Sequence, residues 1–409
     1  MKNSLLFLTL LLITMTTPAQ SNAQTEFVKV AVDEASVGKI TVTPKLPEDG
    51  SVAVGTQLTL RAIPQQGATL DALYYSYPGA WGTMYSESME DEYSFVVEKE
   101  IQLGASFIAT QEVDHIDVTQ NIVYAQPGVK PLKYDVFSPK QAKNLPLIII
   151  IHGGGWSSNT EDIMRGLARE LTRSGNFVVA SLDYRWLNKL DGDTTENQMH
   201  HLIEDVYGGI LHIQEHAATY GGDGNQIFVT GDSAGGHLSS SVANMIEFIG
   251  AEGFGAQPGV FELQPTYMPK NKTIDEARNG LLQAIKGAAP SYGVFDTTLL
   301  GRFVPSEGDY GWHVAPINKI PLAKDRSIPQ FLTRGTLDQL IVDKGVADYT
   351  KALEAAGHRV EYVQVGGAGH AFFDWKPDAR TKATFYAYGV YYAQRMEAFF
   401  SSVLEENQK

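Results

Sequence analysis

The chain has 409 residues and a formal net charge of −15, from 47 acidic and 32 basic residues. Hydrophobic residues make up 43% and charged residues 19%, which is typical of a soluble globular protein and excludes disordered, collagen-like and polytopic membrane chains. Nucleic acid is not an expected partner, because binding it requires a basic footprint. At about 150 residues per domain, the length predicts more than one domain.

Residues 1–23 have the pattern of a secretory signal peptide. Lys2 precedes the apolar stretch 5–15, and Ser21 and Ala23 are the small residues that a signal peptidase reads. The apolar run is shorter than the roughly 20 residues of a membrane-spanning helix. The chain has no cysteine, so neither a disulfide nor a lipid-modified cysteine is expected. We therefore predict a periplasmic or secreted protein without a stable membrane anchor.

Residues 24–111 are predicted to form a small all-β module. Short runs of alternating polar and apolar residues, at 39–43, 57–61 and 93–97, are separated by turns rich in proline and glycine. The spacing within residues 38–44 and 93–95 resembles the divergent repeats of internalin-type bacterial surface proteins. The module also holds an aromatic cluster, which either forms its core or offers flat faces to sugar rings: Tyr74, Tyr75, Tyr77, Trp81 and Tyr85.

Residues 112–409 show a different pattern, in which strands and helices alternate. Apolar residues from Ile203 to Ala217 recur at helical spacing. Strands buried on both faces are predicted from nearly continuous apolar runs at 147–151, 177–182, 226–230, 330–333 and 360–365. This alternation predicts an α/β fold with a mostly parallel central sheet, preceded by the small all-β domain.

Residues 231–235, Gly-Asp-Ser-Ala-Gly, lie between a predicted strand and a helical segment, the context of a G-x-S-x-G nucleophile elbow. The elbow makes Ser233 the candidate nucleophile. Residues 152–156, His-Gly-Gly-Gly-Trp, directly follow strand 147–151, where such hydrolases place backbone N–H donors for an oxyanion. The alternative for the glycines is an ordinary flexible turn.

A serine nucleophile needs a base, and His370 is the candidate. It follows strand 360–365, and Asp338, which follows strand 330–333, can accept its other ring N–H. Along the chain the serine comes first, then the aspartate and then the histidine, which is the order of a triad built on a G-x-S-x-G elbow. We expect His152 to fix the glycine loop and Asp232 to be structural. No metal is expected, because the chain has no H-E-x-x-H motif and no cysteine pair.

Five blocks resemble the α/β-hydrolase esterases of the hormone-sensitive-lipase type and the related feruloyl and acetyl esterases. They are residues 121–124 with 132–137, 152–156, 183–185, 220–237 and 335–370. The resemblance implies an α/β-hydrolase domain over 112–409 without a cofactor. By position it implies a triad of Ser233, Asp338 and His370 and an oxyanion hole from the amides of Gly154, Gly155 and Ala234.

The chain departs from these esterases in two places. After residues 183–185 they commonly continue Leu-Ala-Pro-Glu, whereas this chain continues Trp-Leu-Asn-Lys. The β module stands where they often carry a helical cap, which implies an open site, although the insertion 249–284 could cover it.

These features predict an exported serine ester hydrolase that removes acetyl or feruloyl-type groups from carbohydrate. The alternatives are an esterase of lipids or small esters and a non-catalytic binding protein. Trp156 and Phe372 are expected to flank a short acyl group, unless they are ordinary core residues. The β module is expected to take no part in catalysis, because all the triad and oxyanion candidates follow Lys143. The sequence indicates neither the acyl group and sugar nor an oligomeric state.

Overall fold

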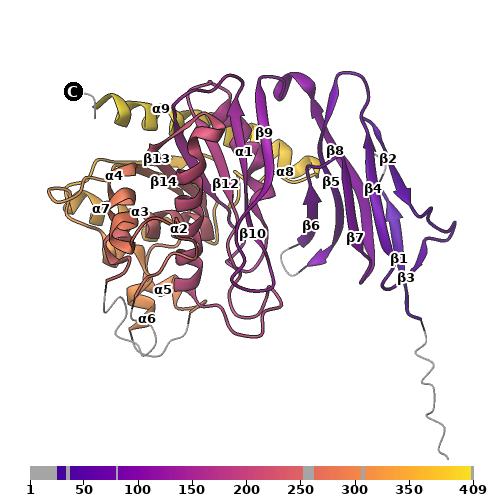
Figure 1. Ribbon diagram of the computed structural model, residues 1–409, viewed down its shortest axis with the longest axis horizontal. Coiled ribbons are helices and arrows are strands. Elements are labelled where there is room, and N and C mark those ends of the chain that lie inside the picture. Colours follow the sequence, from indigo (N-terminus) through magenta and orange to yellow (C-terminus); the bar gives the residue numbers. More distant parts are fainter. Residues whose placement is uncertain (1–24, 34–36, 80–81, 252–261, 305–308, 407–409) are drawn as a thin grey trace, which may run out of the picture.

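The computed structural model describes residues 25–33, 37–79, 82–251, 262–304 and 309–406 (Figure 1). The predicted signal peptide and Trp81 lie outside these ranges. Among the described residues, no helix is both long and apolar enough to cross a membrane.

An eight-stranded sheet forms the centre of the larger part of the chain, in the order β16-β15-β14-β13-β11-β12-β10-β9. The strands from β12 through β11 to β16 are parallel, and β10 pairs antiparallel with both β12 and β9. The predicted mostly parallel sheet is thus confirmed. The strands are β9 Ile116–Ala125, β10 Leu132–Pro139, β11 Leu145–Ile151, β12 Val178–Leu182, β13 Gly222–Asp232, β14 Ile285–Ser291, β15 Gln330–Gly335 and β16 Val360–Val365.

Helices cover both faces of this sheet, so its central strands are buried on both sides (Figure 1). The run Ile148–Ile151 of β11 is fully buried, as the continuous β-branched pattern predicted. The helices are α1 Arg165–Thr172, α2 Met199–His216, α3 Ala234–Met245, α4 Ile274–Ala284, α5 Thr297–Leu300, α6 Tyr310–His313, α7 Asp343–Ala355, α8 Ala379–Thr384 and α9 Val390–Glu406.

The described part of the insertion 249–284 packs against the body of this domain. The N–H of Thr266 donates to the carbonyl of Glu204 on α2 at 3.1 Å, and α4 contacts β13 and β14. Residues 252–261 lie outside the described ranges.

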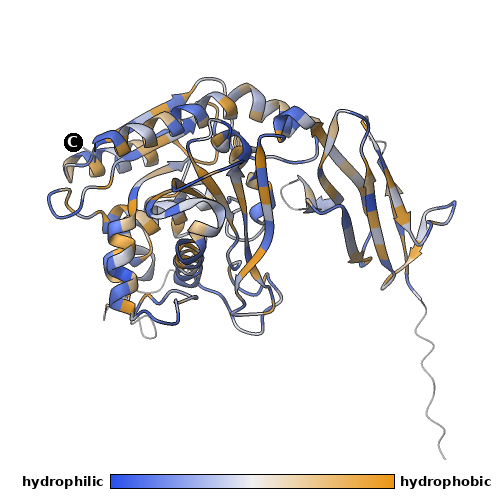
Figure 2. Ribbon diagram, turned by 45° about the horizontal axis from the view of Figure 1, so that its top comes forward, coloured by the Kyte–Doolittle hydropathy of each residue, from blue (hydrophilic) through white to orange (hydrophobic). Residues whose placement is uncertain are grey.

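Residues 27–109 form two smaller sheets around their own core, which confirms the all-β prediction. One sheet has the order β3-β1-β8-β5-β6 and the other β2-β4-β7. Figure 2 shows hydrophobic positions along the strands of both sheets. The resemblance to internalin-type repeats stays a prediction. The strands are β1 Phe27–Val32, β2 Lys39–Thr43, β3 Ser51–Ala53, β4 Gln57–Ile63, β5 Ala68–Gly79, β6 Gly82–Ser88, β7 Glu92–Val96 and β8 Ile101–Ala109.

A buried carboxylate of the β module joins it to the larger domain. Asp71 on β5 accepts hydrogen bonds from Arg165 Nε at 3.0 Å, Arg169 Nη1 at 2.8 Å and Trp375 Nε1 at 3.0 Å, and Lys382 Nζ lies 3.5 Å away. Burial opposes ionisation of Asp71, but the three cations hold the pKa of this carboxyl well below its usual value. The module is therefore anchored by desolvated, mutually compensating charges.

This anchor indicates that removing the module would affect the larger domain. Arg165 is fully buried and Arg169 is 7% exposed, so deletion of residues 24–111 would take away the carboxylate that both guanidinium groups bind. We expect the deletion to destabilise the larger domain.

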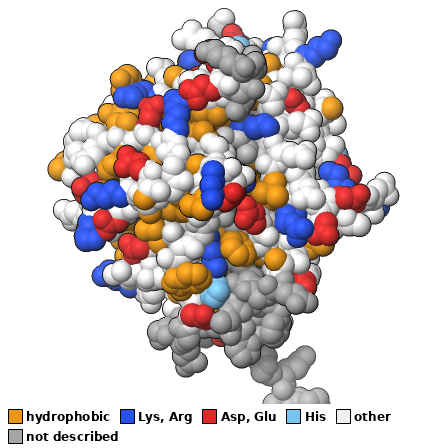
Figure 3. Space-filling view, turned by 90° about the vertical axis from the view of Figure 1, so that its left-hand side faces the viewer, with side chains coloured by type: hydrophobic (Ala, Val, Ile, Leu, Met, Phe, Trp, Pro, Cys, Tyr) orange, Lys and Arg blue, Asp and Glu red, His pale blue; other side chains and the backbone are white. Residues whose placement is uncertain are grey.

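On the opposite face, shown in Figure 3, acidic and basic side chains are interspersed among apolar ones. The charge of this face is thus mixed, in keeping with the absence of long charge runs in the sequence.

Asp71→Asn should lower the free energy of unfolding by about 3–5 kcal/mol, because it removes the carboxylate that two buried guanidinium groups share and leaves Arg165 with Glu87 as its remaining ion-pair partner. The pKa of Asp71 is lowered in the folded state, so its contribution to stability is present above about pH 4, the unfolded value, and is lost as pH falls through the folded pKa. Urea unfolding followed by circular dichroism measures both effects. Asp49→Asn, at an exposed carboxyl 3.7 Å from Lys29, is the control and should change little. Equal stability of the two variants would contradict this role of Asp71.

Candidate active site

Ser233 lies on the turn between β13 and α3 in a strained backbone conformation, with φ 54° and ψ −113°. The flanking glycines make this turn possible. A Cβ on Gly231 would lie 2.4 Å from the carbonyl oxygen of Gly235, and one on Gly235 would lie 1.9 Å from that of Ile151. The strand, turn and helix therefore have the geometry of the nucleophile elbow that the motif predicted.

The structure brings the three predicted triad side chains together. Ser233 Oγ lies 2.9 Å from His370 Nε2, and His370 Nδ1 lies 2.8 Å from Asp338 Oδ2. Ser233 and Asp338 are buried, whereas the His370 side chain is 23% exposed. Their strands, β13, β15 and β16, are parallel, so their carboxyl ends meet at one edge of the sheet.

Asp338 is held as an oriented anion. Its Oδ1 accepts hydrogen bonds from the backbone N–H groups of Leu340 and Ile341, both at 2.9 Å. Burial works against the charge of Asp338, but its interactions with His370 and these amides leave its pKa below the usual value. A charged Asp338 accepts a hydrogen bond from the Nδ1–H of His370 and leaves Nε2 free to accept the Ser233 proton.

The glycine loop after β11 is tied to the elbow after β13. Ile151 pairs with Gly231 in the sheet, and the N–H of Gly153 donates to Asp232 Oδ1 at 2.7 Å. Asp232 is thus structural, as predicted. The loop and the elbow leave the sheet side by side at the same edge.

Three backbone amides beside Ser233 remain the oxyanion-hole candidates. Gly154 and Gly155 have positive φ, at 118° and 62°, which favours glycine at both positions. Ala234 begins α3, and the N–H groups of a helix's first turn have no acceptor within the helix. Their assignment to the oxyanion stays a prediction.

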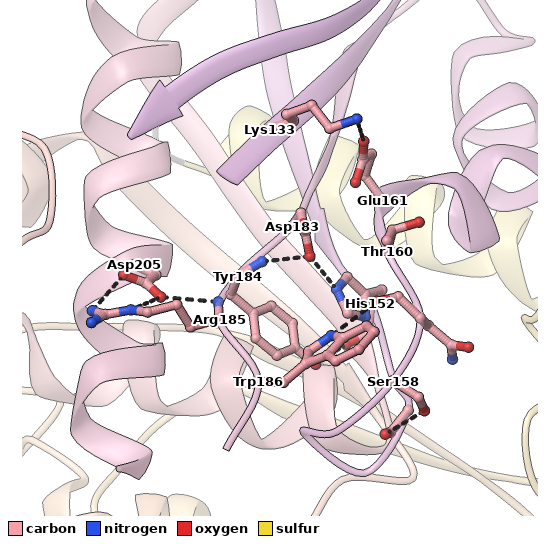
Figure 4. Close-up of polar contacts among 12 residues, drawn as sticks. Lys133, His152, Ser158, Thr160, Glu161, Asp183, Tyr184, Arg185, Trp186 and Asp205 are labelled. Carbon is pink, nitrogen blue, oxygen red and sulfur yellow. Dashed lines mark hydrogen bonds and ion pairs between the residues drawn. The ribbon is translucent and has the colours of Figure 1, made fainter. Parts of the chain in front are cut away.

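His152 holds the glycine loop in place through its ring contacts, as predicted. Its Nδ1 lies 2.7 Å from the carbonyl oxygen of Gly153 and its Nε2 lies 3.1 Å from Asp183 Oδ1. Its ring stacks on Tyr184 with centroids 4.3 Å apart, and the Tyr184 hydroxyl donates to the His152 carbonyl at 2.8 Å. Figure 4 shows this group, with Asp183 and Tyr184 both on the segment after β12.

The segment that departs from the resembled esterases is also anchored. Arg185 donates to both carboxylate oxygens of Asp205 on α2, each at 2.8 Å (Figure 4). Trp186 Nε1 donates to the carbonyl of Asn159 at 3.1 Å, so this segment contacts the end of the glycine loop.

Trp156 and Phe372 are core residues, which corrects the expectation that they flank an acyl group. Trp156 is 1% exposed, with its ring 5.0 Å from that of Phe303. Phe372 is fully buried and packs on Tyr292 at 4.8 Å. Neither side chain is accessible to a substrate in this structure, because close packing surrounds both.

Tyr292 and Asp374 belong to this site, and sequence reasoning missed both. The Tyr292 ring centroid lies 4.9 Å from that of His370, and its hydroxyl accepts from the N–H of Phe373 at 3.2 Å. Burial and the nearby Asp374 carboxylate raise the pKa of Asp232 well above its usual value. Tyr292 follows β14, whose Gly-, Ala- and Pro-containing sequence has no strand signal, so nothing pointed to its position.

A cavity of about 470 Å³ beside His370 is lined in part by the β module. Gly82, Thr83 and Tyr85 of β6 lie on its wall, together with Ala371 and polar residues of the following loop and α8. The module therefore borders this cavity, whereas its predicted lack of a catalytic role stays a prediction, since no triad residue comes from it. Among the described residues, no group of three metal-ligating side chains is placed to hold an ion.

Comparisons with known proteins find similarity to esterases over this part of the chain. A family model described as BD-FAE matches residues 134–253, a range that includes the glycine loop and Ser233 but ends before Asp338. The carboxylesterase NlhH of Mycobacterium tuberculosis is 33% identical over 144 residues, which are 34% of this chain and 41% of that protein. The esterase LipQ of the same species is 26% identical over 306 residues, or 68% of this chain and 64% of LipQ.

A solved structure described as a truncated carbohydrate esterase from gut microbiota has the same fold. Its TM-score is 0.50 at 19% identity, over 71% of this chain and 97% of that one. The larger part of the chain is therefore an α/β-hydrolase fold with a serine, histidine and aspartate at the elbow edge. The chain spans less than half the length of the curated carboxylesterase that it matches.

Gly235→Ala should destabilise the protein by about 1–3 kcal/mol or more, because the added methyl overlaps the carbonyl oxygen of Ile151. Gly280→Ala on α4 is the matched control, since the nearest atom to its added Cβ is 4.0 Å away and alanine favours a helix. Thermal unfolding compares the two. An unchanged melting temperature for Gly235→Ala would show that the elbow has room for a methyl group at this position.

Proposed function

We propose that this protein is an exported serine carboxylic-ester hydrolase that removes acetyl or feruloyl-type acyl groups from carbohydrate. The observation that carries the proposal is the continuous chain of contacts from Ser233 through His370 to Asp338. A non-catalytic binding protein would not need a strained serine within 2.9 Å of an oriented imidazole.

The reaction proceeds in two halves. Ser233 Oγ attacks the ester carbonyl while His370 Nε2 takes its proton, and the charge on Asp338 stabilises the imidazolium. The tetrahedral oxyanion is bound by the N–H groups of Gly154, Gly155 and Ala234. The bond to the alcohol then breaks, and the alcohol leaves with the proton from Nε2.

Water completes the second half. His370 Nε2 accepts a proton from water, whose oxygen attacks the acyl group on Ser233. Collapse of the second tetrahedral intermediate releases the carboxylic acid, and the proton on Nε2 returns to Ser233 Oγ. No cofactor enters either half.

The cavity beside His370 supports a polar alcohol. Its wall carries mostly hydroxyl and charged groups, among them Thr83, Asp374, Lys376 and Arg380. Such a wall can hydrogen-bond the hydroxyl groups of a sugar, whereas a lipid would desolvate these polar groups without offering them hydrogen bonds.

A lipid or small ester is the second candidate. Three exposed apolar side chains, Leu337 at 65%, Leu340 at 47% and Val342 at 58%, lie close to Asp338 in the sequence and offer an apolar surface.

The proposed export of the protein rests on residues 1–23, which have the pattern of a signal peptide.

Ser233→Ala should reduce turnover of p-nitrophenyl acetate to a residual rate about 10³–10⁴-fold above the uncatalysed reaction in water. The oxyanion hole and substrate binding supply this residual rate. The assay measures the release of p-nitrophenolate. Ser174→Ala, at an exposed turn, is the control and should retain activity. Wild-type-like hydrolysis by the Ser233→Ala protein would refute the proposed mechanism.

Across p-nitrophenyl esters from acetyl to octanoyl, kcat/KM should fall with chain length, because the proposed substrates carry short acyl groups and the polar cavity assigned to the alcohol offers no apolar surface to a longer chain. The measurement is initial rates for each ester at matched solubility. A steady rise with chain length would favour the lipid alternative.

A further inference from the structure

A second cleft, of about 440 Å³, lies between the β module and the α/β-hydrolase domain. Tyr77, Tyr85 and Tyr93 line it from the module, and Asn159 and Trp186 line it from the hydrolase side. Its volume is within the range of small-molecule sites. The proposed mechanism uses none of these five side chains.

The cleft adjoins the cavity beside His370. Thr83, Tyr85 and Lys376 line both, so the two spaces share a wall along β6. On the opposite side, Asn159 Nδ2 donates to the carbonyl of Gly153 at 3.3 Å. A molecule in the cleft would therefore lie between β6 and the end of the glycine loop, next to the Ser233 site.

Half-buried tyrosines form one wall of the cleft. The Tyr75 ring is nearly parallel to that of Tyr93, at 7° and 6.1 Å, and stacks on Tyr77 at 28° and 6.2 Å. The Tyr93 hydroxyl is 2.7 Å from Ser86 Oγ, which fixes its direction. These stacked rings line the cleft with apolar carbon and hydroxyl groups, and Lys99 Nζ lies 3.7 Å over the centre of the Tyr77 ring.

The two lysines of the cleft are already paired. Lys133 Nζ donates to Asn121 Oδ1 at 2.6 Å and lies 3.5 Å from Glu161. Lys376 Nζ lies 3.6 Å from Asp374 Oδ2. An anionic ligand would have to compete with these carboxylates for the two ammonium groups, so the cleft favours a neutral ligand.

A neutral molecule with many hydroxyl groups and flat apolar ring faces matches this lining. We propose that the cleft binds a neutral oligosaccharide, the alcohol part of the substrate, and presents its ester to Ser233 through the cavity beside His370. This inference rests on the proposed function and adds that the β module is part of the substrate site.

The binding test uses the full-length Ser233→Ala protein, in which the ester is not consumed. Isothermal titration with acetylated xylo-oligosaccharide, a neutral probe, gives Kd. Adding Tyr77→Ala or Trp186→Ala should raise Kd at least ten-fold. Adding Tyr391→Ala, at a 57% exposed tyrosine of α9 outside the cleft, should leave Kd within two-fold.

A second variant blocks the cleft without removing an aromatic face. Thr83→Trp places a large ring where the two cavities meet. Its loss in kcat/KM on the acetylated oligosaccharide should exceed its loss on p-nitrophenyl acetate at least ten-fold. Equal losses on both esters would overturn the proposal.

The remaining outcomes separate this inference from the esterase proposal. If wild-type protein hydrolyses p-nitrophenyl acetate in a Ser233-dependent way but Tyr77→Ala and Trp186→Ala leave Kd unchanged, the cleft proposal fails and the esterase proposal stands. If an acidic oligogalacturonate bound with the same Kd as the acetylated xylo-oligosaccharide, the proposal that the cleft selects neutral sugars would also be wrong. If the ester is not hydrolysed but the sugar binds in a Tyr77-dependent way, the esterase proposal fails instead.

Discussion

The buried Asp71 carboxylate is the contact on which the arrangement of the two domains depends. It accepts hydrogen bonds from two arginines of α1 and from Trp375, which follows His370 in the loop before α8. One side chain of the β module thus binds both a helix of the hydrolase fold and the loop that carries the candidate base. Desolvated charges in fixed geometry are costly to separate, so this contact holds β6 beside the active site.

This arrangement divides the chemistry between two parts of the chain. The α/β-hydrolase domain supplies Ser233, Asp338 and His370, and its parallel sheet brings them to one edge. The β module supplies Thr83 and Tyr85 to the walls beside His370. If the alcohol binds as proposed, substitutions on β6 would alter its recognition while the triad geometry stays the same, because the two depend on different strands.

The triad was predictable because its signals are local. A nucleophile elbow needs glycine on both sides of the serine within five residues, and the contacts of Gly231 and Gly235 show why. His370 and Asp338 each follow a recognisable apolar strand, and parallel strands end at one edge. Tyr292 was missed because its strand, β14, carries Gly, Ala and Pro in place of a β-branched pattern.

The sequence by itself predicted the alternation of strands and helices after residue 112 except for β14, the all-β character of residues 27–109 and the three side chains that meet as the candidate triad, since periodicity and motif spacing act over a few residues. Tertiary structure alone decided that Trp156 and Phe372 are core and that β6 borders the site. Asp71 and Trp375 are 304 positions apart, and their contact depends on how two folded surfaces fit. Such complementarity leaves no periodic pattern along the chain.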